Sequence, residues 1–215
     1  MDRQLFDYGR PLAGVLNQSH DRIKAAIRAE PESFVVNTDA ERWAAHLAEK
    51  NAADPPVLVM EQLRVEDLGE RQVNATGMAG VSFTSMEWGR AVIRPGLEVQ
   101  LVIPVIGDAE LLRYGPSGGA PTVEADIEAG SVYRRWNWPH IKGPDALSEE
   151  IERLNGQLMH GAEKVAAEIA RHNAALEDFT AEAIAERRAE LARHSGFLAA
   201  LRVPVARRAD APKPF

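Results

Sequence analysis

One proline-free stretch decides the predicted fold: Ser148–Glu186, which reads SEEIERLNGQLMHGAEKVAAEIARHNAALEDFTAEAIAE. No proline occurs anywhere between residues 146 and 202. Apolar residues recur at gaps of three and four, a spacing that is typical of a helix with one apolar stripe and, when sustained, of a coiled coil. Ser148 is the predicted N-cap, and the acidic residues after it suit the positive end of the helix dipole. We therefore expect a long helical arm over 146–202.

The apolar stripe of this arm has to be covered by another surface. A helix over 148–194 would be about 70 Å long at roughly 1.5 Å per residue, longer than a small domain. The cover could come from a second copy of the chain, from an antiparallel return of the arm, or from a sheet. We expect a homo-oligomer, with Gly156, Gly161 and Asn173 as weak points of the helix and Ser195-Gly196 at its end. The candidate interface residues are Ile151, Leu154, Leu158, Val165, Ile169, Leu176 and Phe179.

The remaining sequence predicts mixed structure. A helix is expected over 12–29, ended by Pro31, and a second helix is expected after a cap at Thr38 or Asp39. Strands follow one another without helical crossovers, which favours antiparallel pairing. The expected strands are 34–36, 57–63, one around Val73, Val81 and Phe83, 91–93, 97–103 and 111–112, with a turn at Arg94-Pro95-Gly96.

The predicted fold class is α+β: an antiparallel sheet with N-terminal helices, followed by a long helical, coiled-coil-like arm. The predicted domains are a mixed α+β domain over 1–145, the arm over 146–202, and a basic, proline-containing tail or linker over 203–215.

Composition excludes several classes of chemistry. The chain has 215 residues and a formal net charge of −7, so uniform attraction to nucleic acid or to an anionic membrane is not expected. It has 0 cysteines, which excludes thiol catalysis, disulfides and thiolate metal centres. The N-terminus lacks the apolar run of a secretory signal, and no stretch approaches the length of a membrane span. We expect a cytoplasmic protein that contacts no membrane and uses no cofactor.

Histidine and glutamate lie one helical turn apart at three places on the arm: His160 with Glu163, Glu168 with His172, and Glu190 with His194. Such pairs could hold a metal, but a di-metal site needs several carboxylates and histidines converging from neighbouring helices. The favoured interpretation is pairing on a helix surface. Phosphate loops and nucleophile elbows are also missing from the sequence. The sequence therefore predicts no catalytic and no metal-binding residue.

Bases gather at the end of the arm and in the tail, whereas the arm itself is acidic. The segment 133–142 also interleaves aromatic and basic residues, a combination that can stack bases and contact phosphates. The favoured interpretation of Trp136 and Trp138 is structural, with the indoles packing the arm onto the sheet. The alternative is a nucleic-acid interface, whose candidate residues are Arg187, Arg188, Arg193, Arg202, Arg207, Arg208, Trp136 and Trp138.

Two groups of residues resemble a known family. One is IPVIGDAELL at 103–112, continuing to Pro116-Ser117. The other comprises HNAAL at 172–176, ERR at 186–188 and LRVPVARRADAP at 201–212. They resemble the N-terminal region of an uncharacterised bacterial family whose C-terminal half resembles a PD-(D/E)xK restriction-type nuclease.

This resemblance implies a sheet domain and a helical arm that precede a nuclease-like part. The sequence ends at Phe215, before that part, so no catalytic residue carries over, and any nuclease activity is expected to reside outside this chain. The implied function is a sensing, oligomerisation or regulatory module of a bacterial effector, in nuclease-linked antiviral defence. The implied partners are a second copy of the chain and an effector domain or protein, with nucleic acid as the alternative.

Overall fold

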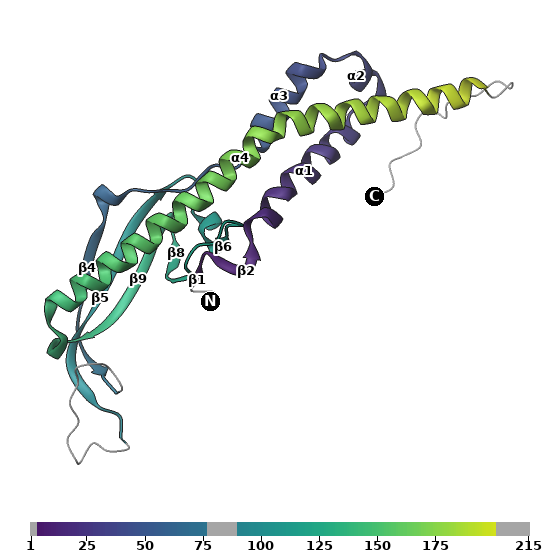
Figure 1. Cartoon of the computed structure of the whole chain (residues 1–215). Coiled ribbons are helices and arrows are strands. Elements are labelled where there is room, and N and C mark those ends of the chain that lie inside the picture. The colour runs from purple at the N-terminus through teal and green to yellow at the C-terminus, as the bar shows by residue number, and fades with distance from the viewer. Residues whose placement is uncertain (1–3, 77–89, 201–215) are drawn as a thin grey trace. The chain divides into compact units, whose positions relative to one another are not determined.

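The structure is a computed structural model that describes residues 4–76 and 90–200 (Figure 1). Mixed helix and sheet are present, as the α+β prediction states. The elements in chain order are β1 (Gln4–Leu5), β2 (Asp7–Pro11), α1 (Leu12–Ala29), α2 (Glu32–Asn37), α3 (Ala40–Asn51), β3 (Val57–Leu58), η1 (Met60–Gln62), β4 (Arg64–Asn74), β5 (Ile93–Ile106), η3 (Ala109–Arg113), β6 (Tyr114–Gly115), β7 (Val123–Glu124), β8 (Asp126–Glu128), β9 (Ser131–Pro139), η4 (His140–Lys142) and α4 (Gly143–Ala200).

The chain forms two compact units. Within the described residues, unit 1 consists of 4–17 and 53–173, and unit 2 consists of 18–52 and 174–200. The predicted boundary at residue 145 divides the chain in a different way and stays a prediction. Both α1 and α4 contribute residues to each unit, because the boundaries fall inside these helices.

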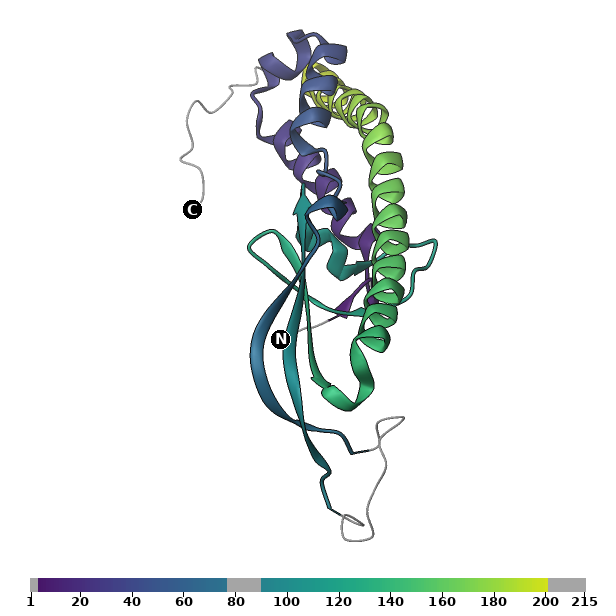
Figure 2. The ribbon, with the colours of Figure 1, turned by 90° about the vertical axis from the view of Figure 1, so that its left-hand side faces the viewer.

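The sheet of unit 1 is built around β5. One edge of β5 pairs antiparallel with β4 and with β3. The other edge pairs antiparallel with β9, which in turn pairs with β8. Figure 2 shows the long strands β4 and β5 curving together. The predicted antiparallel sheet is confirmed, and the predicted strand 97–103 is the centre of the longer strand β5.

The core of unit 1 lies between this sheet and the first part of α4. Alternate residues of β5 point into it, among them Val99, Leu101 and Ile103. From α4 the same core receives Leu158 and Val165, both fully buried. Strand alternation and helical periodicity thus place two apolar stripes face to face.

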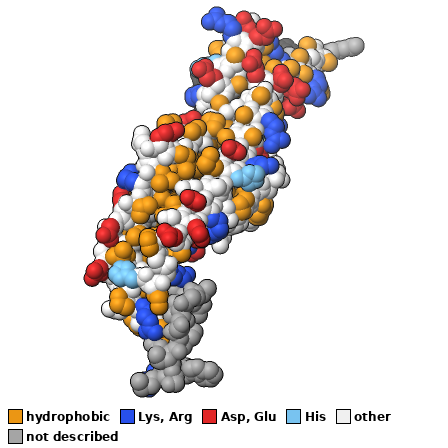
Figure 3. All heavy atoms as spheres, turned by 60° about the vertical axis from the view of Figure 1, so that its left-hand side comes forward, with side chains coloured by type: hydrophobic (Ala, Val, Ile, Leu, Met, Phe, Trp, Pro, Cys, Tyr) orange, Lys and Arg blue, Asp and Glu red, His pale blue; other side chains and the backbone are white. Residues whose placement is uncertain are grey.

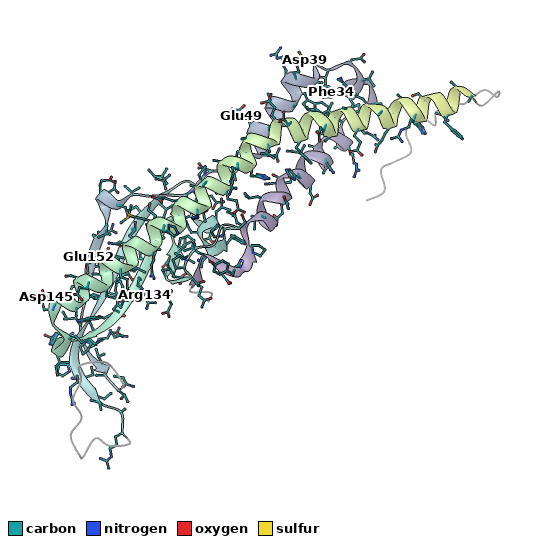
Figure 4. The ribbon with its side chains drawn as sticks, in the orientation of Figure 1. Phe34, Asp39, Glu49, Arg134, Asp145 and Glu152 are labelled. Atoms are coloured by element: carbon teal, nitrogen blue, oxygen red, sulfur yellow. The ribbon has the colours of Figure 1, made fainter. Side chains whose placement is uncertain are left out.

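The core of unit 2 is entirely helical. Ile23 and Ile27 of α1 pack with the second part of α4, α2 and α3. Of the two predicted cap residues, Thr38 and Asp39, it is Asp39, labelled in Figure 4, that caps α3. Its carboxylate accepts hydrogen bonds from the backbone N–H groups of Glu41 and Arg42 at 3.0 and 3.2 Å. The predicted helix over 12–29 is confirmed as α1.

The long helix is confirmed, with different ends. α4 begins at Gly143, so Ser148 lies inside it and donates its hydroxyl hydrogen to Pro144 O at 3.2 Å. At the other end, α4 passes through Ser195-Gly196 and reaches Ala200. A glycine lowers helix stability by about 1 kcal/mol, which is too little to end a long helix by itself.

Residues 34–36 form part of a helix, and the predicted strand is wrong. Pro31 O accepts hydrogen bonds from the N–H groups of Phe34 and Val35 at 3.0 and 3.1 Å. Only Val35 of the three is buried, and the ring of Phe34 meets Trp43 edge to face. A short apolar run does not distinguish helix from strand. The fixed φ of Pro31 favours a helix start here.

Other local predictions are corrected as well. The predicted strand 57–63 is a strand only at β3 and then becomes η1, while residues 111–112 lie in the 3-10 helix η3. No turn forms at 94–96, because these residues pair with β4 inside β5. Gly96 is needed for close approach: a Cβ on it would lie 2.3 Å from Trp138 O.

Part of the predicted strand around Val73 lies within the described residues. Val73 belongs to β4, whose other members were not predicted. Val81 and Phe83 lie outside the described residues, and so does the predicted tail over 203–215.

Candidate functional site

The basic residues near the end of α4 make contacts within unit 2. Arg188 donates from Nε to Val35 O at 2.8 Å and from Nη2 to Thr38 O at 2.6 Å. These carbonyl groups lie in the last turn and at the C-cap of α2, where a helix leaves carbonyls without partners. Arg187 pairs with Glu190, with 3.0 Å between Nη1 and Oε2. Both candidate nucleic-acid residues are thus engaged in internal contacts.

The other candidate arginines give no described basic surface. Arg193 is exposed, and its Nε donates to Ala189 O at 3.4 Å. Arg202, Arg207 and Arg208 lie outside the described residues. On the face that Figure 3 presents, basic and acidic side chains are interspersed. Nucleic-acid binding by this segment stays a prediction.

The two candidate tryptophans face the core side of the sheet. Trp136 is buried in the core of unit 1, and half-buried Trp138 packs against that core. Trp138 Nε1 donates to Gly143 O at 3.0 Å, which ties the end of β9 to the start of α4. Burial makes the indole of Trp136 unavailable for base stacking, and the indole N–H of Trp138 is used within unit 1.

The predicted oligomer interface is covered from within the chain. Leu154, Leu158, Val165 and Ile169 are buried in the core of unit 1, and Ile151 packs against that core. Leu176 is buried in the core of unit 2, and Phe179 packs against it. An uncovered stripe was the reason to expect self-association through these residues, and that reason does not apply to them. Self-association itself stays a prediction.

The histidine–glutamate pairs of the arm do not converge with other ligands. Within residues 4–76 and 90–200, no group of three or more histidine, aspartate or glutamate side chains could hold a metal ion. Glu168 has a different role from the one considered for it. Its Oε2 accepts hydrogen bonds from the backbone N–H and the hydroxyl of Ser117, at 2.6 and 2.8 Å. This buried carboxylate therefore holds the loop after β6 against α4.

A second polar residue of α4 holds another connecting segment. The side chain of Asn173 bonds both backbone polar groups of Ala53, which follows α3. Glu168, Asn173 and Arg188 of α4 thus each bind backbone groups outside the helix: the loop after β6, the segment after α3 and the end of α2. A buried backbone group without a partner would destabilise the fold, so each contact fixes its segment.

The sheet face opposite α4 carries a polar row. Glu66, Gln100 and Arg135 lie directly opposite one another on β4, β5 and β9. Arg135 Nε donates to Gln100 Oε1, and Gln100 Nε2 donates to Glu66 Oε2 at 3.3 Å. Beside this row, the buried Glu98 pairs with Arg71 at 2.7 Å. The row's hydrogen bonds link three strands and satisfy the amide of Gln100, the one member of the row that is buried.

A surface hollow of about 330 Å³ lies at one end of this row. It is lined by Glu124, Ala125, Asp126, Glu128, Tyr133, Arg134 and Arg135. Most of its charges are already paired: Arg134, labelled in Figure 4, lies 2.7 Å from Glu124, and Asp126 lies 3.2 Å from Arg113. Burial lowers the pKa of Arg113, but hydrogen bonds to Glu110 and Asp126 outweigh burial and raise it. Arg113 thereby holds Asp126, one of the residues that line the hollow.

The residues of α4 that bind backbone groups of other segments carry no sequence signal for that role. A helical pattern shows only that a polar residue lies near the apolar stripe, so it leaves Glu168 as one of a histidine–glutamate pair and Asn173 as a weak point of the helix. The polar row had a sequence signal: Glu98 and Gln100 alternate with the apolar residues of 97–103. Its partners on β4 had none, since polar residues predominate along this strand and do not alternate regularly with apolar ones.

Comparisons of this chain with protein-family models, with curated proteins and with solved structures found no match. Within the part of the chain that the structure describes, no helix combines the length and the apolar character that a membrane crossing requires.

Proposed function

We propose that this chain is a non-catalytic regulatory module, in which α4 couples the state of one unit to the state of the other. Sensing of a ligand or partner by one unit would then change the stability of its neighbour. We further propose, from the sequence resemblance alone, that such a module would serve a bacterial effector of nuclease-linked antiviral defence.

The observation that carries the proposal is that one uninterrupted helix supplies core residues to both units. Leu158 and Ile169 of α4 are fully buried in the core of unit 1, and Leu176 and Ile184 are fully buried in the core of unit 2. Helix formation is cooperative, because each turn is propagated from the one before it. Loss of packing on one part of α4 would therefore weaken the adjoining part.

Native-state hydrogen exchange tests this coupling without knowledge of the ligand. Ile184→Ala removes a fully buried side chain from unit 2 and should destabilise it by about 2–5 kcal/mol. The proposal expects the protection of unit 1 amides, such as those of β5, to fall as well. The control is Phe197→Ala, because Phe197 is 67% exposed on the same helix. Unchanged protection of unit 1 in Ile184→Ala would show that the units are independent and would refute the proposal.

Self-association is the second part of the proposed function. Light scattering over a range of concentrations measures it directly. A species of two or more copies supports an assembly role, with an interface other than the buried stripe. A strict monomer at every concentration contradicts that role and leaves the coupling proposal to stand by itself.

Nucleic-acid binding by the C-terminal basic segment is the alternative function. It predicts affinity that weakens steeply with salt, because bound phosphates release counterions. Replacement of Arg202, Arg207 and Arg208 by alanine should abolish that binding. Arg188 is unsuitable for this test, because its alanine variant would also disturb α2.

A further inference from the structure

The contact between Asn173 and Ala53 joins two distant parts of the chain. Ala53 N donates to Asn173 Oδ1 at 3.0 Å, and Asn173 Nδ2 donates to Ala53 O at 2.8 Å. One amide side chain thus satisfies both polar groups of one backbone residue. Asparagine suits this task because it offers one acceptor and two donor hydrogens on a short side chain.

Both residues belong to unit 1, and both lie at its boundary in the chain. Asn173 is the last residue of unit 1 on α4, and Ala53 is the first residue of unit 1 after α3. The Asn173 side chain therefore links two points at which the sequence crosses from one unit to the other. Asn is also a weaker helix former than Ala or Leu, so helix stability does not account for its presence inside α4.

Residues 53–56, which we call the return segment, are also held on a second side. Asp108 N donates to Asp54 O at 3.2 Å. Gly107, with a φ of 86°, lies so close to the segment that a Cβ on it would be 2.3 Å from Pro55 O. Gly107 directly follows β5, so the return segment connects α4, through Asn173, to the end of the central strand.

We propose that Asn173 is the switch residue of the coupling between the units, an inference that rests on the proposed function. While Asn173 binds Ala53, the return segment stays on α4, and a change in unit 2 reaches the sheet of unit 1. When the two hydrogen bonds break, the return segment is released, and the sheet responds to unit 2 only through the packing of α4 itself.

Two variants of Asn173 break the contact in different ways. Asn173→Leu removes both hydrogen bonds and keeps a good helix former. Asn173→Asp keeps an acceptor for Ala53 N and loses the donor to Ala53 O. The control is Ala170→Asp, which places the same charge on an exposed position of α4 one turn earlier. We expect hydrogen exchange at Ala53 to be about tenfold faster in Asn173→Leu, the effect of about 1.4 kcal/mol of lost hydrogen bonding. It should be unchanged in Ala170→Asp.

The deciding experiment combines these variants with Ile184→Ala and measures the protection of β5 amides. The expected result is that Ile184→Ala lowers this protection equally in the parent chain and in Ala170→Asp, and by a clearly smaller amount in Asn173→Leu. If Asn173→Leu does not fold, Asn173→Asp takes its place in the same comparison. An equal loss of protection with and without Asn173 would overturn the switch and leave the proposed function intact. No loss in the parent chain would overturn the proposed function, and the switch with it.

Discussion

Gly161 of α4 lies against the ring of Phe6, and an added methyl group should not fit there. A Cβ on Gly161 would lie 2.3 Å from Phe6 Cε2 and from Phe6 Cζ, well inside van der Waals contact. The ring cannot easily move aside, because Phe6 is 0% exposed and its φ of 57° is unusual for a residue other than glycine. Gly161→Ala therefore forces a rearrangement in the core of unit 1.

The matched control is Gly156→Ala on the same helix. A Cβ on Gly156 would have no neighbour within 4 Å, so this change should only add helix propensity, about 1 kcal/mol. The same gain applies to Gly161→Ala and cancels when the two variants are compared. The difference between them is then the cost of overpacking, so Gly161→Ala should be less stable than Gly156→Ala by about 1–3 kcal/mol.

Urea unfolding followed by tryptophan fluorescence measures both variants, since Trp136 and Trp138 report on unit 1. A double-mutant cycle with Phe6→Leu adds a second check, because a smaller side chain at residue 6 should recover part of the stability of Gly161→Ala. Equal unfolding free energies for Gly161→Ala and Gly156→Ala would refute the close packing of Phe6 on α4.

Three further substitutions test contacts of the same helix. Glu168→Ala should lower the free energy of unfolding by about 2–3 kcal/mol in urea, because two hydrogen bonds to a carboxylate are lost. Exposed Glu163→Ala is its control, and similar values for the two would argue against the loop contact. Arg188→Ala should lower the midpoint of thermal unfolding by several degrees, whereas Arg193→Ala, at an exposed position, should not. Equal midpoints for the two variants would show that the hydrogen bonds of Arg188 to α2 contribute nothing to stability. Trp138→Phe should cost about 1 kcal/mol through the lost bond to Gly143, and an unchanged urea midpoint would contradict that bond.

Much of the architecture follows from local sequence signals. The long helix is encoded by an uninterrupted apolar repeat without proline, and the Asp39 cap of α3 is an equally local signal. Strand alternation in 97–103 likewise predicts the centre of β5. A short apolar run such as Phe34–Val36 is compatible with both helix and strand. Here the preceding Pro31 favours the start of a helix.

The polar contacts of the candidate site could not be predicted in the same way. Ser117 lies 51 residues from Glu168, and Ala53 lies 120 residues from Asn173. Nothing in the sequence around Asn173 indicates a backbone partner, because Ala53 contributes only its N–H and carbonyl groups. From the sequence alone, Gly161 indicates only a weak point of a helix. The structure shows that the ring of Phe6 packs against it.

The sequence by itself determined that a long amphipathic helix exists and which of its sides is apolar, because helical periodicity is a property of neighbouring residues. Only the tertiary structure decided what covers that side, since the sheet, α1, α2 and α3 come from distant parts of the chain. It also decided which polar residues of α4 bind backbone, because a hydrogen bond depends on where two groups meet in space.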